Sequence, residues 1–226
     1  MQIREEGTKM INSALKSSIL SARLIPNASA HLLKQFDVPQ GHVSLGIFTA
    51  DSDDVAYTAL DEATKKSDIS VVYAKSFYGG AANANTKLAG EMMGVISAKT
   101  PADVKTGLDV IAHFIEHGAH FVSANDDDSI AYFAHCISRT GSFLSNMCGI
   151  EQGSSLAYLI APPLEAMYAL DAALKASDTT LVSFYGPPTE TNFGGGLLTG
   201  SQSSCEAAAS AFAAAVKEVA NNPIKL

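Results

Sequence analysis

Two stretches of the chain repeat each other. Residues 56–72 read AYTALDEATKKSDISVV, and residues 166–182 read AMYALDAALKASDTTLV. Nine of the seventeen aligned positions are identical, whereas ordinary composition would give about one or two matches. A period of about 110 residues is far longer than the units of about 20 to 50 residues that build solenoids. The repeat therefore indicates that a whole small domain has been duplicated.

Each half carries its predicted elements in the same order: a strand, a helix, a second strand, a glycine-rich loop and an alanine-rich helix. The pattern predicts these bounds: strand 43–49, helix 53–66 and strand 69–75 in the first half, and strand 156–160, helix 164–176 and strand 179–184 in the second. Strands that alternate with helices predict an α/β (α+β) fold. We expect two similar domains, residues 1–117 and 118–226, each a small sheet with flanking helices.

The composition excludes several classes of protein. With 226 residues, 47% of them hydrophobic, the chain is long enough to bury the cores of one or two domains. It has no run of about 18 apolar residues and no cleavable signal sequence, so we expect a cytosolic location and no membrane partner. Its three cysteines lack CxxC spacing, which predicts reduced thiols. A formal net charge of -8 offers no basic surface for nucleic acid, whereas a cationic small molecule would be attracted.

The two equivalent helices begin differently. In the first half, Asp51 and Ser52 are candidate caps, and Asp53 and Asp54 fall in the first turn. In the second half, a Pro-Pro pair precedes the helix, and Glu165 is aligned with Asp54. Acidic side chains in a first turn stabilise a helix through its macrodipole. They therefore indicate either capping alone or a functional role.

Two turn-rich stretches, residues 76–91 and 185–201, occupy equivalent places after the second strand of each half. Both combine Gly, Asn and Thr with an aromatic residue. Loops of this kind approach ligands closely, line apertures and move between arrangements, but they also serve as plain surface connections. Neither stretch matches GxGxxG or GxxxxGK[ST], so the sequence gives little support for nucleotide binding.

The stretch HFIEH matches the inverted zinc motif HxxEH, with His113, Glu116 and His117 on one helix. A zinc-dependent hydrolase is therefore an alternative function. No third protein ligand is identifiable from the sequence, and His117 at a helix C-terminus also interacts favourably with the helix dipole. A small-molecule sensor built from the same duplicated domains is a further alternative.

Several long segments point to one family: TADSDDVAYTALDEATKKSD, NTKLAGEMMG, FVSANDDDSIAYFAHCISRTGSFLS, YLIAPPLEAMYALDAALK and PPTETNFGGGLLTGSQSSC. With these segments in order over residues 32–223, the chain resembles the L-type shell proteins of the ethanolamine-utilisation bacterial microcompartment. The resemblance implies a tandem pair of circularly permuted bacterial microcompartment (BMC) domains without enzymatic activity. It also implies a homotrimer that forms a pseudohexameric tile beside other shell proteins, in a microcompartment in the cytoplasm.

The resemblance also assigns residues. It implies a gated central pore surrounded by the glycine-rich loops, with these pore-loop residues: Gly79, Gly80, Gly194, Gly195 and Gly196. It implies a small channel between the two domains that binds ethanolamine through Asp53, Asp54, Glu91, Phe121, Thr191, Asn192 and Phe193. Glu165 matches a position that contacts zinc in the family, so zinc is an optional ligand although no cofactor is required. Such a tile would control metabolite passage and retain a volatile intermediate.

Overall fold

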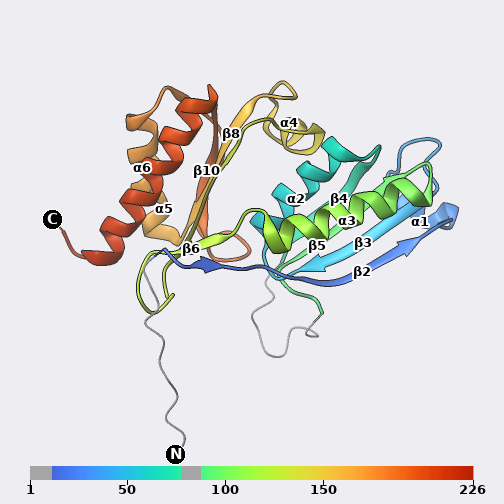
Figure 1. Ribbon diagram of the computed structural model, residues 1–226, viewed down its shortest axis with the longest axis horizontal. Helices are drawn as coiled ribbons and strands as arrows, with labels where there is room; N and C mark the ends of the chain where they lie inside the picture. Colours follow the sequence, from blue (N-terminus) through green and yellow to red (C-terminus); the bar gives the residue numbers. More distant parts are fainter. Residues whose placement is uncertain (1–11, 78–87, 226) are drawn as a thin grey trace, which may run out of the picture.

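Two antiparallel sheets organise the chain in the computed structural model, which describes residues 12–77 and 88–225 (Figure 1). The first sheet has the strand order β2 (Ile19–Ile25), β3 (Ser44–Ala50), β5 (Met92–Ala98) and β4 (Ser70–Ser76). The second has the order β1 (Ala14–Leu15), β6 (Phe121–Ser123), β7 (Ala131–Ile137), β8 (Ser155–Ala161), β10 (Gly194–Gly200) and β9 (Thr179–Tyr185). The helices are α1 (Ala30–Gln35), α2 (Asp53–Lys66), α3 (Pro101–His117), α4 (Ser142–Cys148), α5 (Pro163–Ala176) and α6 (Gln202–Asn221). Among the described residues, no helix combines the length and apolar character needed to cross a membrane.

The two sheets repeat one connectivity, which confirms the predicted α/β fold with a duplicated unit. The order β2-β3-β5-β4 matches the order β7-β8-β10-β9, and α2 and α5 follow equivalent strands. A β-bulge recurs as well, because the pairing skips Val72 in β4 and Val182 in β9. The domain boundary between residues 117 and 118 falls between α3 and β6 and stays a prediction. Strand β1 pairs with β6 and so joins the second sheet.

Local sequence explains the buried face of α2 and the start of α3. Helix α2 has the predicted bounds, and its small or apolar residues Ala56, Leu60 and Ala63 are fully buried at helical spacing. Helix α3 begins after Thr100, whose side chain accepts a hydrogen bond from the Asp103 N–H. Pro101 occupies the first turn of α3, where its missing N–H group leaves no helical bond unmade.

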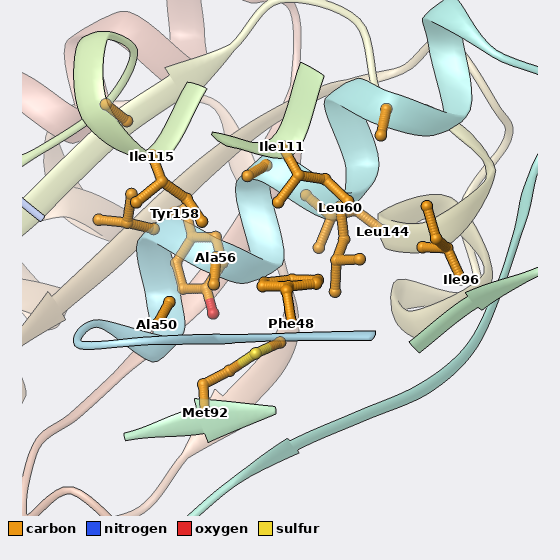
Figure 2. Packing of buried hydrophobic residues seen from close by; sticks show 14 of the residues in the cluster. Phe48, Ala50, Ala56, Leu60, Met92, Ile96, Ile111, Ile115, Leu144 and Tyr158 are labelled. Carbon is orange, nitrogen blue, oxygen red and sulfur yellow. The ribbon is translucent and has the colours of Figure 1, made fainter. Parts of the chain in front are cut away.

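One hydrophobic core joins the two halves. Figure 2 shows Leu60 of α2, Ile111 of α3 and Tyr158 of β8 within one cluster of buried side chains, although β8 belongs to the second half. Helices α5 and α6 pack on the opposite face of the second sheet (Figure 1). Alternate residues of β8 contribute to these two cores: Leu156, Tyr158 and Ile160 to the first, and Ala157, Leu159 and Ala161 to the second. Helices α2 and α3 therefore hold the first half against the second sheet.

Gly194, Gly195 and Gly196 lie in strand β10, so the loop predicted over residues 185–201 is wrong from Gly194 onward. Strand β10 runs between β8 and β9, and these glycines are buried. Close packing explains the glycine run, because a Cβ atom on Gly195 would collide with the Leu159 carbonyl oxygen, and Gly195 has a φ of +147°. The connection that remains is residues 186–193. The other predicted pore-loop residues, Gly79 and Gly80, lie outside the described residues.

Asp61 of α2 binds the start of α4 across the two halves. Its side chain is fully buried, and its two carboxylate oxygens accept hydrogen bonds from the N–H groups of Gly141 at 2.7 Å and Leu144 at 2.9 Å. These N–H groups belong to a helix start, where donors have no partner within the helix. Asp61 also forms an i,i+4 ion pair with Lys65 at 3.7 Å. Its counterpart in the repeat, Asp171, forms the equivalent pair with Lys175 but is exposed.

Asp61→Ala is expected to lower the free energy of unfolding by about 2–3 kcal/mol, because two buried N–H groups lose their acceptor. The matched variant Asp171→Ala removes an exposed i,i+4 ion pair and is expected to cost less than about 0.5 kcal/mol. Urea unfolding followed by circular dichroism measures both values. Equal effects of the two substitutions would contradict the role given to Asp61.

Candidate functional site

A cleft of about 360 Å³ lies between the two halves of the chain. The start of α2 and strand β4 form its wall on the first half, and α4, β8, β9 and the connection 186–193 form its wall on the second. Four of the residues predicted to bind ethanolamine line this cleft: Asp53 and Asp54 from the first turn of α2, and Thr191 and Phe193 from the connection. The fold thus brings residues far apart in the sequence to one place.

The other three predicted binding residues lie around the cleft and not in its lining. Glu91 is half-buried just before β5, close enough to Asp53 for the two charges to repel each other. The ring of Phe121 meets the ring of Phe193 edge-on, with the centroids 5.7 Å apart. Asn192 is exposed, and it has a φ of +65° in the turn that presents Phe193.

The acidic end of the cleft concentrates negative charge. Asp53 and Asp54 are only 8% and 7% exposed. Burial raises the pKa of Asp53, and burial followed by repulsion from Asp53 raises the pKa of Asp54 well above its usual range. Burial and repulsion from Asp53 and Asp51 raise the pKa of Glu91 to about 7. Within residues 12–77 and 88–225, no lysine, arginine or histidine forms an ion pair with Asp53, Asp54 or Glu91.

Hydrogen bonds hold this acidic end in place. The Tyr158 hydroxyl of β8 donates to Asp54 Oδ1 at 2.7 Å, so the second half fixes a carboxylate of the first. The Asp54 N–H donates to Asp53 Oδ1 at 2.8 Å. The neighbouring Ser52 Oγ is buried and has no hydrogen-bond partner among the described residues. Two buried carboxylates without a cationic partner are electrostatically suited to a small organic cation.

The sequence did not identify Tyr158 or Tyr57 as site residues. Tyr57 follows Asp53 by four positions on α2, so helical spacing places it on the same face and was an available signal. Its hydroxyl lies 2.7 Å from Ser76 Oγ of β4. Tyr158 lies in an apolar strand of the other half, and its spacing gave no signal of a polar contact with Asp54.

The predicted metal-binding residues do not form a metal centre in the described part of the chain. Exposed His113 and His117 stack their rings with centroids 4.9 Å apart, and the described residues include no group of three or more metal ligands. Glu165 lies in the first turn of α5. Because α2 and α5 have equal length, Leu164 and not Glu165 occupies the position of Asp54. A zinc contact at Glu165, and the independence from cofactors, stay predictions.

The chain is similar over nearly its whole length to proteins of known class. The BMC domain model matches residues 44–125. The chain is 57% identical over 215 residues to the bacterial microcompartment shell protein EutL of Clostridium perfringens (strain 13 / Type A), covering 95% of this chain and 99% of that protein. It is 46% identical to EutL of Escherichia coli (strain K12), covering 93% and 96% of the two chains. The crystal structure of the ethanolamine utilization protein EutL from Leptotrichia buccalis C-1013-b matches with a TM-score of 0.94 and 66% identity, covering 96% of this chain and all of that one.

Proposed function

Because this chain belongs to the EutL family of bacterial microcompartment shell proteins, we propose that it forms a homotrimeric tile and binds ethanolamine in the cleft between its halves. Proteins of this family are structural components of the ethanolamine-utilisation microcompartment shell and not enzymes. The alternative of a zinc hydrolase at His113, Glu116 and His117 is therefore wrong. Other shell proteins are the expected neighbours of the tile.

The main observation that supports ethanolamine binding is the pair of buried carboxylates, Asp53 and Asp54, which have no cationic partner among the described residues. An ammonium group donates three hydrogen bonds, which carboxylates accept strongly. The Thr191 side chain offers a hydrogen bond to the ligand hydroxyl, with Asn192 beside it at the exposed edge. The ring of Phe193, which lines the cleft with Phe121 packed edge-on behind it, favours a cation through its face.

Ethanolamine affinity is expected to rise about tenfold between pH 6 and pH 8. The pKa of Glu91 is raised to about 7, so raising the pH through this range removes its proton and adds a negative charge beside the site, while an alkylammonium stays protonated. Isothermal titration calorimetry at both pH values measures the change. Glu91→Gln is the matched control and should reduce the rise in affinity between pH 6 and pH 8. A pH profile that is the same in both proteins would contradict the role of Glu91.

The repeat supports contact between copies of the chain, because a polar pair that joins the two halves has an apolar counterpart in the repeat. Within the chain, the Tyr158 hydroxyl of β8 bonds to Asp54 of α2. In the repeat, Leu164 of α5 occupies the position equivalent to Asp54, and Ile47 of β3 occupies the position equivalent to Tyr158. Leu164 is 63% exposed and belongs to an α5–β9 patch of exposed apolar side chains: Leu164, Tyr168, Leu181 and Phe184.

Within the chain, the second half covers α2 and β4 of the first half. A second copy of the chain would cover the equivalent elements α5 and β9, and with them this patch. The counterparts of the α5–β9 patch in the first half are Asp54, Thr58, Val71 and Ala74, all of them buried or half-buried. We propose that the β2–β3 face of one copy, which carries Ile47, packs on the α5–β9 patch of the next. Such head-to-tail contacts close into a ring when the rotation between copies permits. Six similar halves from three chains would then complete a pseudohexamer.

A gated central pore completes the proposal. Thr191 and Phe193 at the cleft belong to the connection 186–193, which leads directly into strand β10 with its glycines. Ethanolamine would favour one arrangement of this connection only if its affinities for the two arrangements differ. Saturating ethanolamine is therefore expected to change hydrogen exchange over residues 186–193, with helix α6 as the internal reference. Unchanged exchange at a saturated site would contradict ligand-controlled gating.

A further inference from the structure

The cleft is much larger than the ligand assigned to it. Ethanolamine has four non-hydrogen atoms and would fill roughly a third of the 360 Å³, taking about 30 Å³ per atom as in liquid water. Cavities of this size commonly hold ligands several times larger. The remaining space adjoins the acidic end and has walls of its own.

Those walls are apolar and aromatic. Tyr57 lies one helical turn beyond Asp53, and its ring stacks on Phe143 of α4 with the centroids 6.1 Å apart and an interplanar angle of 23°. Met147, one turn further along α4, and Val71 of β4 also line the cleft. A ligand whose charged end lies at Asp53 therefore has apolar side chains beside its other end.

The chemistry of the acidic end selects the charged group. Carboxylates accept hydrogen bonds, and a primary ammonium provides three donors whereas a quaternary ammonium provides none. A hydrocarbon or aromatic substituent that enters the apolar part of the cleft loses contact with water, which favours binding. A ring can also pack against the rings of Tyr57 and Phe143.

We propose that the cleft binds primary amines that carry an aromatic ring on a short chain, and binds them more tightly than it binds ethanolamine. The ammonium lies at Asp53 and Asp54, and the ring lies against Tyr57 and Phe143. This inference rests on the proposed function, because it assumes the same ammonium subsite. The probe 2-phenylethylamine has nine non-hydrogen atoms and fits the volume by the same measure of about 30 Å³ per atom.

Competition calorimetry of 2-phenylethylamine against ethanolamine tests the proposal on the intact protein. We expect the aromatic amine to bind about tenfold more tightly. Phe143→Ala should bring the ratio of the two dissociation constants close to one. Phe114→Ala, an equal truncation on α3 outside the cleft, should leave the ratio near ten. Thermal unfolding of both variants verifies that they are folded.

The outcomes separate this inference from the proposed function. If ethanolamine binds and 2-phenylethylamine binds equally or more weakly, the inference is overturned and the ethanolamine site stands. If 2-phenylethylamine binds and ethanolamine does not, the inference is supported and the ethanolamine assignment falls. If neither amine binds, both are overturned. A preference that survives Phe143→Ala unchanged would also overturn the placement of the ring.

Discussion

Asp54→Asn is expected to weaken ethanolamine binding at least a hundredfold and, at the same time, to raise the melting temperature of the chain at pH 7. The loss of affinity follows because the ammonium loses a buried charge partner, and breaking such a pair costs about 3–5 kcal/mol. The asparagine side chain keeps an oxygen that accepts the hydrogen bond of Tyr158, so the packing of β8 on α2 is preserved.

The gain in stability follows from the sign of the pKa shift. Burial, and then repulsion from Asp53, raise the pKa of Asp54 well above its ordinary value of 3.8, so the folded chain holds this proton more tightly than the unfolded chain. The stability that the carboxyl group contributes is therefore fully present below about pH 4 and is lost as the pH rises toward the folded pKa. Asparagine removes this dependence.

Calorimetric titration and thermal unfolding at pH 5 and pH 7 measure the two effects of Asp54→Asn. Asp171→Asn makes the same chemical change at an exposed position of the repeat and should alter neither binding nor stability appreciably. An Asp54→Asn variant that retains full affinity would remove Asp54 from the site. A variant that loses stability at pH 7 would contradict the electrostatic account of the acidic end.

The double substitution Leu164→Asp and Phe184→Asp is expected to abolish the trimer and leave folded monomers. Both side chains are more than half exposed in the single chain, so placing charges there costs the monomer little. In the proposed trimer they are buried against the β2–β3 face of the next copy, where two unpaired carboxylates would be strongly unfavourable. The expected change is therefore in assembly and not in folding.

Light scattering behind size-exclusion chromatography measures the mass of this double variant, and circular dichroism reports its fold. Ile224→Asp changes an apolar side chain that is 87% exposed and lies outside the α5–β9 patch, so it should leave the trimer intact. A double variant that remains trimeric would show that the patch is not the interface between copies.

The repeat allowed much of the fold to be predicted, because helical and strand periodicities are local. Helix α2 has its predicted bounds, and β3, β4, β8 and β9 begin and end within one residue of theirs. Strand β10 was missed because Gly194, Gly195 and Gly196 have low strand propensity. Their presence is explained by close packing, of Gly195 against Leu159 and of Gly196 against Leu181. Strand propensity describes single residues and does not include the close packing that neighbouring strands require.

The candidate site was predictable only in part. An acidic first turn pointed to Asp53 and Asp54, but the sequence could not distinguish capping from binding there. Their burial, which favours a binding role, comes from the shared core between the halves. The contact of Tyr158 with Asp54 was not predictable, because β8 is buried on both faces and its residues show no alternation of polar and apolar side chains. Contacts between the two halves therefore had to be read from the structure.

Native mass spectrometry of the intact protein with ethanolamine reports both assembly and ligand number in one spectrum. The proposed function predicts a trimer of 23.6 kDa chains that binds up to three ethanolamine molecules, and an Asp54→Asn trimer that binds none. A monomer, or a trimer whose ethanolamine count is the same with and without the Asp54 carboxylate, would contradict it.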